Sequence, residues 1–390
     1  MNADEILEAL ALERRRPDLA SLRDLFDAFN RAVPFESASK IARDAEVPSI
    51  ADKLRVTELF WSDHLELGTG GTCFARVAAF AALAEALGFR PAKILGGIMG
   101  PRNHASVLFD IDGRTWLADP GYPLPSLLPL ESASLDTPVG SLEFAVSGKA
   151  AVLRFVSGPE YGRVIDFAFD PVSEEEFRAA WEKTFVRTSL FLREVVVRKP
   201  DGHRVLRFFR GAVDVSDAHS RTRLPLLGGR AAKLSSLFGI DAGLLARALS
   251  ITGDRAPERT TARVEAYAEG PESEARFRAL STPGGYRRFL AGLGSVEIEG
   301  AEEGRWRAVV RPESGETVAE DVEASGDLLR IRRAGGLAES GFELDRSAGE
   351  PRLVRFAELP DAREEFLRVD AGRGRIAGML AMDLLALSRL

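Results

Sequence analysis

The chain has 390 residues, of which 45% are hydrophobic and 28% charged, and its net charge is −7. This length and balance predict a globular protein with two domains. The acidic balance excludes the basic surface that nucleic-acid binding requires, and no stretch reaches about 18 uncharged apolar residues. We therefore expect neither a nucleic acid nor a membrane as a partner. No secretory signal is recognisable in the first residues, which predicts a cytoplasmic protein.

The first predicted domain spans residues 1–252. Residues 1 to about 90 are predicted to be helical, because apolar residues recur there at helical spacing. Short alternating segments follow up to about residue 210 and favour strands, and Asp-Gly pairs at 112–113 and 201–202 are typical of hairpins. Residues 231–250 are predicted to return to helix.

The polar stretch at 251–261 predicts a connector to a second domain over 261–390. There, ARVEAYAE predicts a strand with Val264, Ala266 and Ala268 on one face, and PESEARFRALS predicts a helix. Several alternating segments follow, and a long helix is predicted over about 376–390. This order predicts an α+β domain with helices packed on an antiparallel sheet.

Cys73 is the only cysteine of the chain, which excludes an intramolecular disulfide and a zinc site of several cysteines. It follows Gly70 and Gly71 and precedes a run that predicts a helix. A helix N-terminus stabilises a thiolate, and the backbone N–H groups of Gly71 and Cys73 are placed to bind an oxyanion. Cys73 is therefore a candidate nucleophile, and the alternative is a small buried apolar residue.

A hairpin with Asp112 and Gly113 as its two-residue turn would place Ser106 opposite Asp119. His104 would then be a diagonal neighbour of Asp119 on the same face, within reach of a hydrogen bond. With Cys73 this predicts a nucleophile, a base and an orienting carboxylate. The alternative is a purely structural His–Asp bond.

The other histidines point to no site. His64 is predicted at the surface or in a lid, His203 in an exposed turn and His219 in a polar loop. No two histidines have metal-ligand spacing, so we expect neither a metal nor a bound cofactor.

An ordered set of segments resembles the arylamine N-acetyltransferases over about residues 5–250. The segments are VPFES (33–37), GGTCFA (70–75), HASVLF (104–109), WLADPGY (116–122), RTSLF (187–191) and LFGID (237–241). The resemblance implies a fold of a helical bundle, a β-barrel and an α/β lid, with a papain-like arrangement of Cys, His and Asp.

The resemblance also implies a ping-pong acyltransferase. Cys73 would take an acetyl group from acetyl-CoA, the cosubstrate, and pass it to an arylamine, a hydrazine or a related small-molecule amine. His104 would be the base, Asp119 would orient it, and Phe35 and Tyr122 would lie near the acceptor.

Two positions depart from the family pattern. Thr69 stands where the family has an arginine, and Ala75 stands where it has a glutamate. Glu36 would pair with that arginine, and we hypothesise that Arg76 replaces it. A longer acyl donor, or an amide-forming role as in macrolactam-releasing relatives, therefore stays open.

Two further alternatives belong to other classes of protein. One is a transglutaminase-like or papain-like hydrolase that would use the same three residues. The other is a catalytically silent protein that binds a small molecule on the same scaffold.

Residues 261–390 resemble the START-like helix-grip domains, in which an antiparallel sheet wraps a long C-terminal helix. The stretch GRGRIAGMLAMDLLALSRL resembles that helix. The resemblance implies a pocket for a hydrophobic ligand, and the alternative is a domain that only stabilises or dimerises the protein.

Overall fold

The computed structural model describes residues 1–253, 256–257, 261–293, 295–302, 304–312, 317–333, 339–347 and 351–359. The chain forms two compact units. Unit 1 comprises Met1–Phe155, Val164–Val213 and Leu226–Glu258; unit 2 comprises Val156–Arg163, Asp214–Pro225 and Arg259–Leu390. Unit 2 thus includes two segments that precede the predicted boundary at 252–261, and the division into domains 1–252 and 261–390 stays a prediction.

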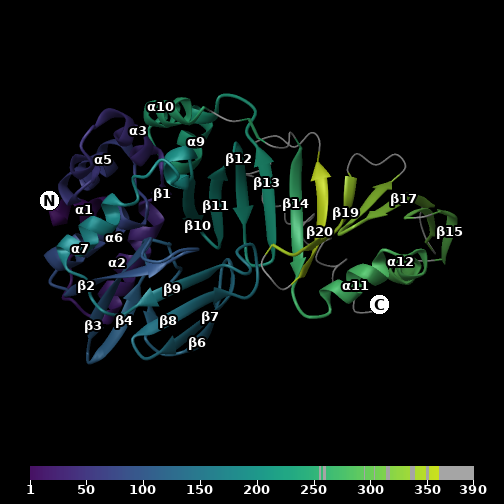
Figure 1. The fold of residues 1–390 in the computed structure, drawn as a ribbon, viewed down its shortest axis with the longest axis horizontal. Coiled ribbons are helices and arrows are strands. Elements are labelled where there is room, and N and C mark those ends of the chain that lie inside the picture. The colour runs from purple at the N-terminus through teal and green to yellow at the C-terminus, as the bar shows by residue number, and fades with distance from the viewer. Residues whose placement is uncertain are drawn as a thin grey trace. The chain divides into compact units, whose positions relative to one another are not determined.

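The first part of unit 1 is helical, as the apolar spacing predicts (Figure 1). Its elements are α1 (Ala3–Ala9), α2 (Leu19–Ala32), the short strand β1 (Phe35–Glu36), α3 (Ala38–Glu46), α4 (Ile50–Lys53), α5 (Thr57–Leu67) and α6 (Cys73–Ala86).

Helix α6 is the central helix of this part. Its residues are buried on nearly all sides, and Phe80 packs edge-on against both Phe26 and Phe29 of α2. The predicted helix after Cys73 is therefore confirmed, and a helix so enclosed holds its first residue in a fixed place.

The sheet of unit 1 has the strand order β5-β4-β3-β2-β9-β8-β7-β6, and α6 packs on β2 and β3. Ile111 lies opposite Arg114, and both turn residues have positive φ, 52° at Asp112 and 75° at Gly113. The predicted hairpin is thus confirmed in register and turn. The strands are β2 (Pro91–Gly97), β3 (His104–Ile111), β4 (Arg114–Ala118), β5 (Leu128–Pro129), β6 (Ala133–Thr137), β7 (Gly140–Ser147), β8 (Ala150–Phe155) and β9 (Val164–Ala168).

The second predicted hairpin is also present, since β10 (Val197–Asp201) pairs with β11 (Arg204–Phe209), and β1 pairs with β10. The return to helix predicted over 231–250 is confirmed, and it takes the form of two helices, because Gly239, at φ 77°, ends the first and Asp241 caps the second. These two helices are α9 (Arg230–Phe238) and α10 (Ala242–Thr252); the elements α7 (Glu174–Glu182), α8 (Leu190–Arg193) and β12 (Ala212–Ser216) precede them.

Unit 2 contains an antiparallel sheet in the order β13-β14-β20-β19-β18-β17-β16-β15. Helices α11 (Ser273–Leu280) and α12 (Pro283–Leu290) lie against one face of it (Figure 1). The strands are β13 (Ser220–Pro225), β14 (Ala262–Ala268), β15 (Ser295–Glu302), β16 (Arg305–Arg311), β17 (Val318–Ser325), β18 (Leu328–Arg333), β19 (Glu339–Asp345) and β20 (Arg352–Leu359).

The predicted face of the first strand after the connector is confirmed. Val264 and Ala266 of β14 are buried in the core of unit 2, and Ala268 packs against it. The long helix predicted over 376–390 lies outside the described residues, so the START-like assignment stays a prediction.

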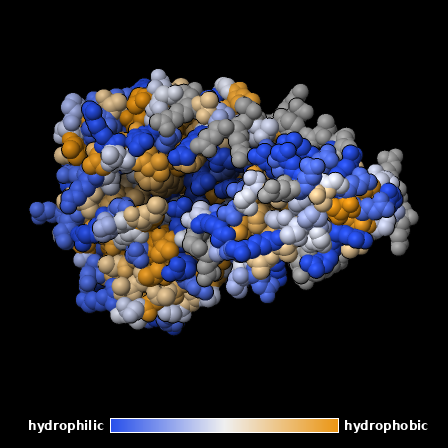
Figure 2. Space-filling model, turned by 45° about the vertical axis from the view of Figure 1, so that its right-hand side comes forward, coloured by the Kyte–Doolittle hydropathy of each residue, from blue (hydrophilic) through white to orange (hydrophobic). Residues whose placement is uncertain are grey.

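Hydrophilic residues cover most of the face drawn in Figure 2, with hydrophobic ones in smaller groups. Among the helices that the structure describes, none is long and apolar enough to cross a bilayer.

Candidate active site

Cys73 is the first residue of α6 and is largely buried, at 8% exposure. The side chain of Thr72, at the N-cap, makes no capping bond, so it does not take up an N–H group of the first turn. Before it, Gly70 touches Pro34 so closely that an added Cβ would lie 1.7 Å from the Pro34 carbonyl oxygen. Glycine at position 70 thus allows a close approach to another stretch of protein backbone.

His104, at the start of β3, and Asp119, just after β4, are both buried and in contact. His104 Nε2 lies 2.7 Å from Asp119 Oδ2, which confirms the predicted pairing. The other carboxylate oxygen accepts a bond of 2.8 Å from the backbone N–H of Tyr122. Asp119 is therefore held on both oxygens, and the imidazole orientation is fixed.

The side chains of Cys73 and His104 both lie next to the backbone of Gly121. A Cβ built there would lie 3.0 Å from the Cβ of Cys73 and 3.1 Å from Cε1 of His104. Burial by itself lowers the pKa of His104, but the charge and hydrogen bond of Asp119, together with those of Cys73, raise it to about 10. His104 is thus protonated at neutral pH.

The two aromatic residues predicted at the acceptor site contact the segments that carry Cys73 and Asp119. Phe35 forms a backbone bridge with Gly71, and its ring is 5.3 Å from that of Phe191. Tyr122 is 5.7 Å from Phe155, ring to ring, and the Arg198 guanidinium lies 4.7 Å from its ring centroid. The structure thus brings both aromatics to the segments that carry Cys73 and Asp119.

The proposed replacement of the missing arginine by Arg76 is wrong. Glu36 is fully buried, and its cationic neighbour is Arg55, with Nη1 3.8 Å from Oε1. Arg76 instead donates from Nε to the Pro120 carbonyl at 2.6 Å and from Nη2 to Asn30 Oδ1 at 2.8 Å. Its Nη1 donates to the Val33 carbonyl, so the hydrogen bonds of the Arg76 guanidinium go to acceptors other than Glu36.

The histidines outside the pair have different surroundings. His64 is half-buried in α5, and its Nδ1 lies 2.7 Å from the carbonyl oxygen of Thr69. His203 is exposed in the turn after β10 and His219 is exposed before β13, as expected. Among the residues that the structure describes, no cluster of His, Cys, Asp and Glu could hold a metal ion.

Two charged residues near Cys73 were not foreseen from the sequence, Arg55 and Lys40. Lys40 donates from Nζ to the backbone oxygen of Thr184 at 2.9 Å and to its hydroxyl at 2.7 Å. Burial lowers the pKa of Lys40 to about 8, against the opposing effect of a charged Cys73. Neither residue has a spacing to Cys73 that a periodic pattern would reveal.

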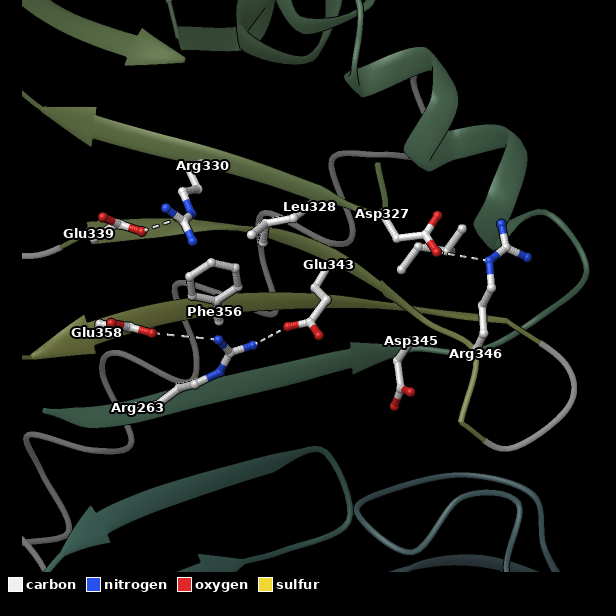
Figure 3. Close-up of a pocket in the computed structure, with 11 residues that line it drawn as sticks. Arg263, Asp327, Leu328, Arg330, Glu339, Glu343, Asp345, Arg346, Phe356 and Glu358 are labelled. Carbon is white, nitrogen blue, oxygen red and sulfur yellow. Dashed lines mark hydrogen bonds and ion pairs between the residues drawn. The ribbon is translucent and has the colours of Figure 1, made fainter. Parts of the chain in front are cut away.

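Unit 2 has a pocket of about 380 Å³ on its sheet, drawn in Figure 3. Its charged side chains pair with one another: Arg263 lies between Glu343 at 2.6 Å and Glu358 at 3.6 Å, and the Arg263 guanidinium stacks over Phe356. Arg346 forms an ion pair with Asp327, with Nε 3.1 Å from Oδ2. A lining of paired charges differs from the hydrophobic pocket that the START-like resemblance implies.

Comparison with known proteins identifies the class of the chain. Residues 18–240 match the sequence profile of the N-acetyltransferase family, which is more than half of the chain. A curated arylamine N-acetyltransferase / N-hydroxyarylamine O-acetyltransferase of Salmonella typhimurium is 27% identical over 152 residues. That alignment covers 36% of this chain and 51% of the relative, so the match spans about half of the relative's length.

Solved structures agree on the fold. An arylamine N-acetyltransferase of Mycobacterium smegmatis is 19% identical with a TM-score of 0.56, covering 65% of this chain and 99% of its own. The enzyme of Mycobacterium marinum, solved in complex with CoA, is 18% identical with a TM-score of 0.55, covering 64% of this chain and 99% of its own. The chain belongs to the arylamine N-acetyltransferase family, and Cys73, His104 and Asp119 lie within the matched residues.

Proposed function

We propose that the protein is an acetyl-CoA-dependent N-acyltransferase that uses Cys73 as its nucleophile. The observation that carries the proposal is the position of Cys73 at the start of α6, beside an imidazole that Asp119 holds at 2.7 Å. Family membership supports the same chemistry.

The first half-reaction forms a thioester on the protein. The Cys73 thiolate attacks the acetyl carbonyl of acetyl-CoA, and the oxyanion is stabilised by the backbone N–H groups of Gly71 and Cys73. The bond to the CoA sulfur breaks, and His104 gives its proton to the departing thiolate. CoA is a cosubstrate here, and we propose no bound cofactor.

The second half-reaction regenerates the protein. An arylamine, a hydrazine or a related amine attacks the thioester carbon, and His104 takes the proton that the nitrogen loses. The carbon–sulfur bond breaks, the amide leaves, and Cys73 returns as a thiolate. Phe35 and Tyr122 are the proposed contacts of the acceptor, since their aromatic rings lie beside the segments that hold Cys73 and Asp119.

For unit 2 we propose a START-like helix-grip fold. A strand, two helices and then antiparallel strands, with β14 next to β20, support it. The charged pocket of Figure 3 gives no support to a hydrophobic ligand there.

Intact-protein mass spectrometry tests the proposed activity. After brief incubation with acetyl-CoA, we expect the mass to rise by one acetyl group in the parent protein and to stay constant in Cys73→Ala. Adding an arylamine should then remove the group and release the acetylated amine.

No mass gain with acetyl-CoA or with longer acyl-CoA donors would contradict the transferase. Release of free acid without an amine would favour a cysteine hydrolase. A Cys73 that reacts with iodoacetamide no faster than an ordinary thiol would favour a silent binding protein.

A further inference from the structure

The guanidinium of Arg55 holds the segment that leads into the nucleophile. Arg55 is 4% exposed; Nη1 donates to the carbonyl oxygen of Gly70 at 2.5 Å, and Nη2 donates to the hydroxyl of Thr69 at 2.8 Å. The Thr69 carbonyl is in turn held by His64. Thr69 and Gly70 are therefore both fixed by side chains from α5 and the loop before it.

The same guanidinium also compensates a buried charge. Arg55 Nη1 lies 2.8 Å from Ser39 Oγ and 3.8 Å from Glu36, and Nε contacts Asp63 at 2.8 Å. Glu36 is bound by the backbone N–H of Ser39 at 2.8 Å, and its own N–H donates to Gly71 at 3.1 Å. Arg55 thus joins α3, α5 and the backbone that ends at Cys73.

We propose that Arg55 is a positioning residue for Cys73. From the loop before α5, it supplies the guanidinium that an arginine at position 69 would supply. Thr69 is fully buried, and its hydroxyl already points at the Arg55 guanidinium. An arginine at position 69 would therefore enter the same place from the opposite side. A displacement of a nucleophile by about 1 Å costs on the order of 10²-fold in rate, so the effect should be measurable.

This role can be tested with a double-mutant cycle, in which Thr69→Arg should slow the parent protein but accelerate the Arg55→Ala variant. Arg55→Ala removes the ion-pair partner of Glu36 and should slow the reaction of Cys73 by about 10²-fold. Thr69→Arg alone places two guanidinium groups in one buried site and should also slow it. Together, Arg55→Ala and Thr69→Arg should recover about 10-fold or more relative to Arg55→Ala, because one guanidinium again fills the site.

The readout is the rate at which iodoacetamide alkylates Cys73 in the folded, full-length protein. This measurement needs no acyl donor. The role of Arg55 rests on the proposed function, in which Cys73 is the nucleophile. The alkylation rate still tests the positioning by Arg55 if the protein accepts no acetyl group. Acetylation by acetyl-CoA, followed by mass spectrometry, is measured in parallel.

Two variants separate positioning from general stability. Arg43→Ala removes an arginine of α3 that binds the carbonyl of Asp52, away from the glycine pair, and should leave the alkylation rate unchanged. Arg55→Lys keeps the charge but cannot reach both Thr69 and Gly70, so it should react more slowly than the parent while remaining folded.

If the doubly substituted protein reacts no faster than Arg55→Ala, the proposal is overturned. Should Arg55→Ala fail to fold, Arg55→Lys decides: a folded variant that is alkylated at the parent rate contradicts the positioning role equally.

Discussion

Asp119 sets the charge of the imidazole beside Cys73. A buried histidine without a partner would lose its proton more easily, since burial lowers its pKa. The carboxylate of Asp119 overcomes that effect and keeps the imidazolium that a neighbouring thiolate needs. The reactivity of Cys73 thus depends on Asp119, which is distant in sequence and acts on Cys73 through His104.

Asp119→Asn should therefore lower acetyl transfer by about 10²- to 10⁴-fold. The amide cannot stabilise the imidazolium, and His104 becomes neutral at pH 7. Alkylation of Cys73 by iodoacetamide at pH 6 to 7 should slow in parallel. The matched control is Asp110→Asn on the same hairpin, whose exposed carboxylate accepts a hydrogen bond from the Thr115 hydroxyl. Equal rates in the two variants would contradict this role of Asp119.

The pH dependence of stability has a defined sign. The pKa of His104 is raised from 6.5 to about 10. The contribution of the His104–Asp119 pair to the free energy of unfolding is therefore complete below pH 6.5 and is lost as the pH rises through 10. Urea unfolding at pH 7 and pH 10 should show a fall in the free energy of unfolding, and this fall should be smaller in Asp119→Asn. A fall of equal size in both proteins would contradict the assignment.

Local chemistry made the contact between His104 and Asp119 predictable from sequence. The Asp112-Gly113 turn fixes the register of its hairpin, and that register carries His104 to Asp119. Arg55 could not be predicted, because nothing in the sequence ties it to Thr69, which it meets only after α5 folds back. Arg76 was preferred for its nearness in sequence to Cys73, but the helix turns it toward Pro120.

At the scale of elements, the entry to α6 depends on a close backbone contact. Glu36 donates from its backbone to Gly71, and Gly70 lies against Pro34. The β1 strand and the start of α6 thus approach closer than any side chain at position 70 would permit.

Gly70→Ala should abolish acetyl transfer and lower thermal stability. Its Cβ would lie 1.7 Å from the Pro34 carbonyl oxygen, which is backbone and cannot move aside without moving β1. Gly284→Ala is the control, because a Cβ there meets no atom within 4 Å. Thermal unfolding and the mass-spectrometric assay measure both variants. Parent-like activity in Gly70→Ala would show that the contact is not required.

Elements with strong periodicity were predictable, and those with competing signals were not. Strand β14 and helix α11 follow their apolar patterns. Helix α12 was missed because Pro283 and the two glycines after it resemble a loop, although Thr282 caps it and proline suits a first turn. Strand β19 has a weak alternation because it contains glycine and acidic residues, and its pairing with β18 and β20 overrides that weakness.

At the scale of the whole molecule, unit 2 is assembled from separate stretches of chain. Strand β13, which precedes the predicted boundary, pairs with β14, which follows it, from Ser220 opposite Ala266 to Arg223 opposite Arg263. Arg221 of β13 contacts Glu265 of β14 at 2.6 Å. Glu265 is buried between two arginines, which hold its pKa at about 2 despite burial.

A chain that ends at residue 253 should therefore be less stable than the full chain, against the expectation of an independent first domain. Cutting there removes β14 and leaves β13 with an unpaired edge and Arg221 without its carboxylate. We expect a lower melting temperature by several degrees and association into larger species in size-exclusion chromatography. Glu265→Gln in the full chain is the control, since it removes the charge and keeps the strand; it should melt lower but remain a single species. A truncated chain that is monomeric and melts like the full chain would establish the division at 252–261, and with it the independence of the part that carries Cys73.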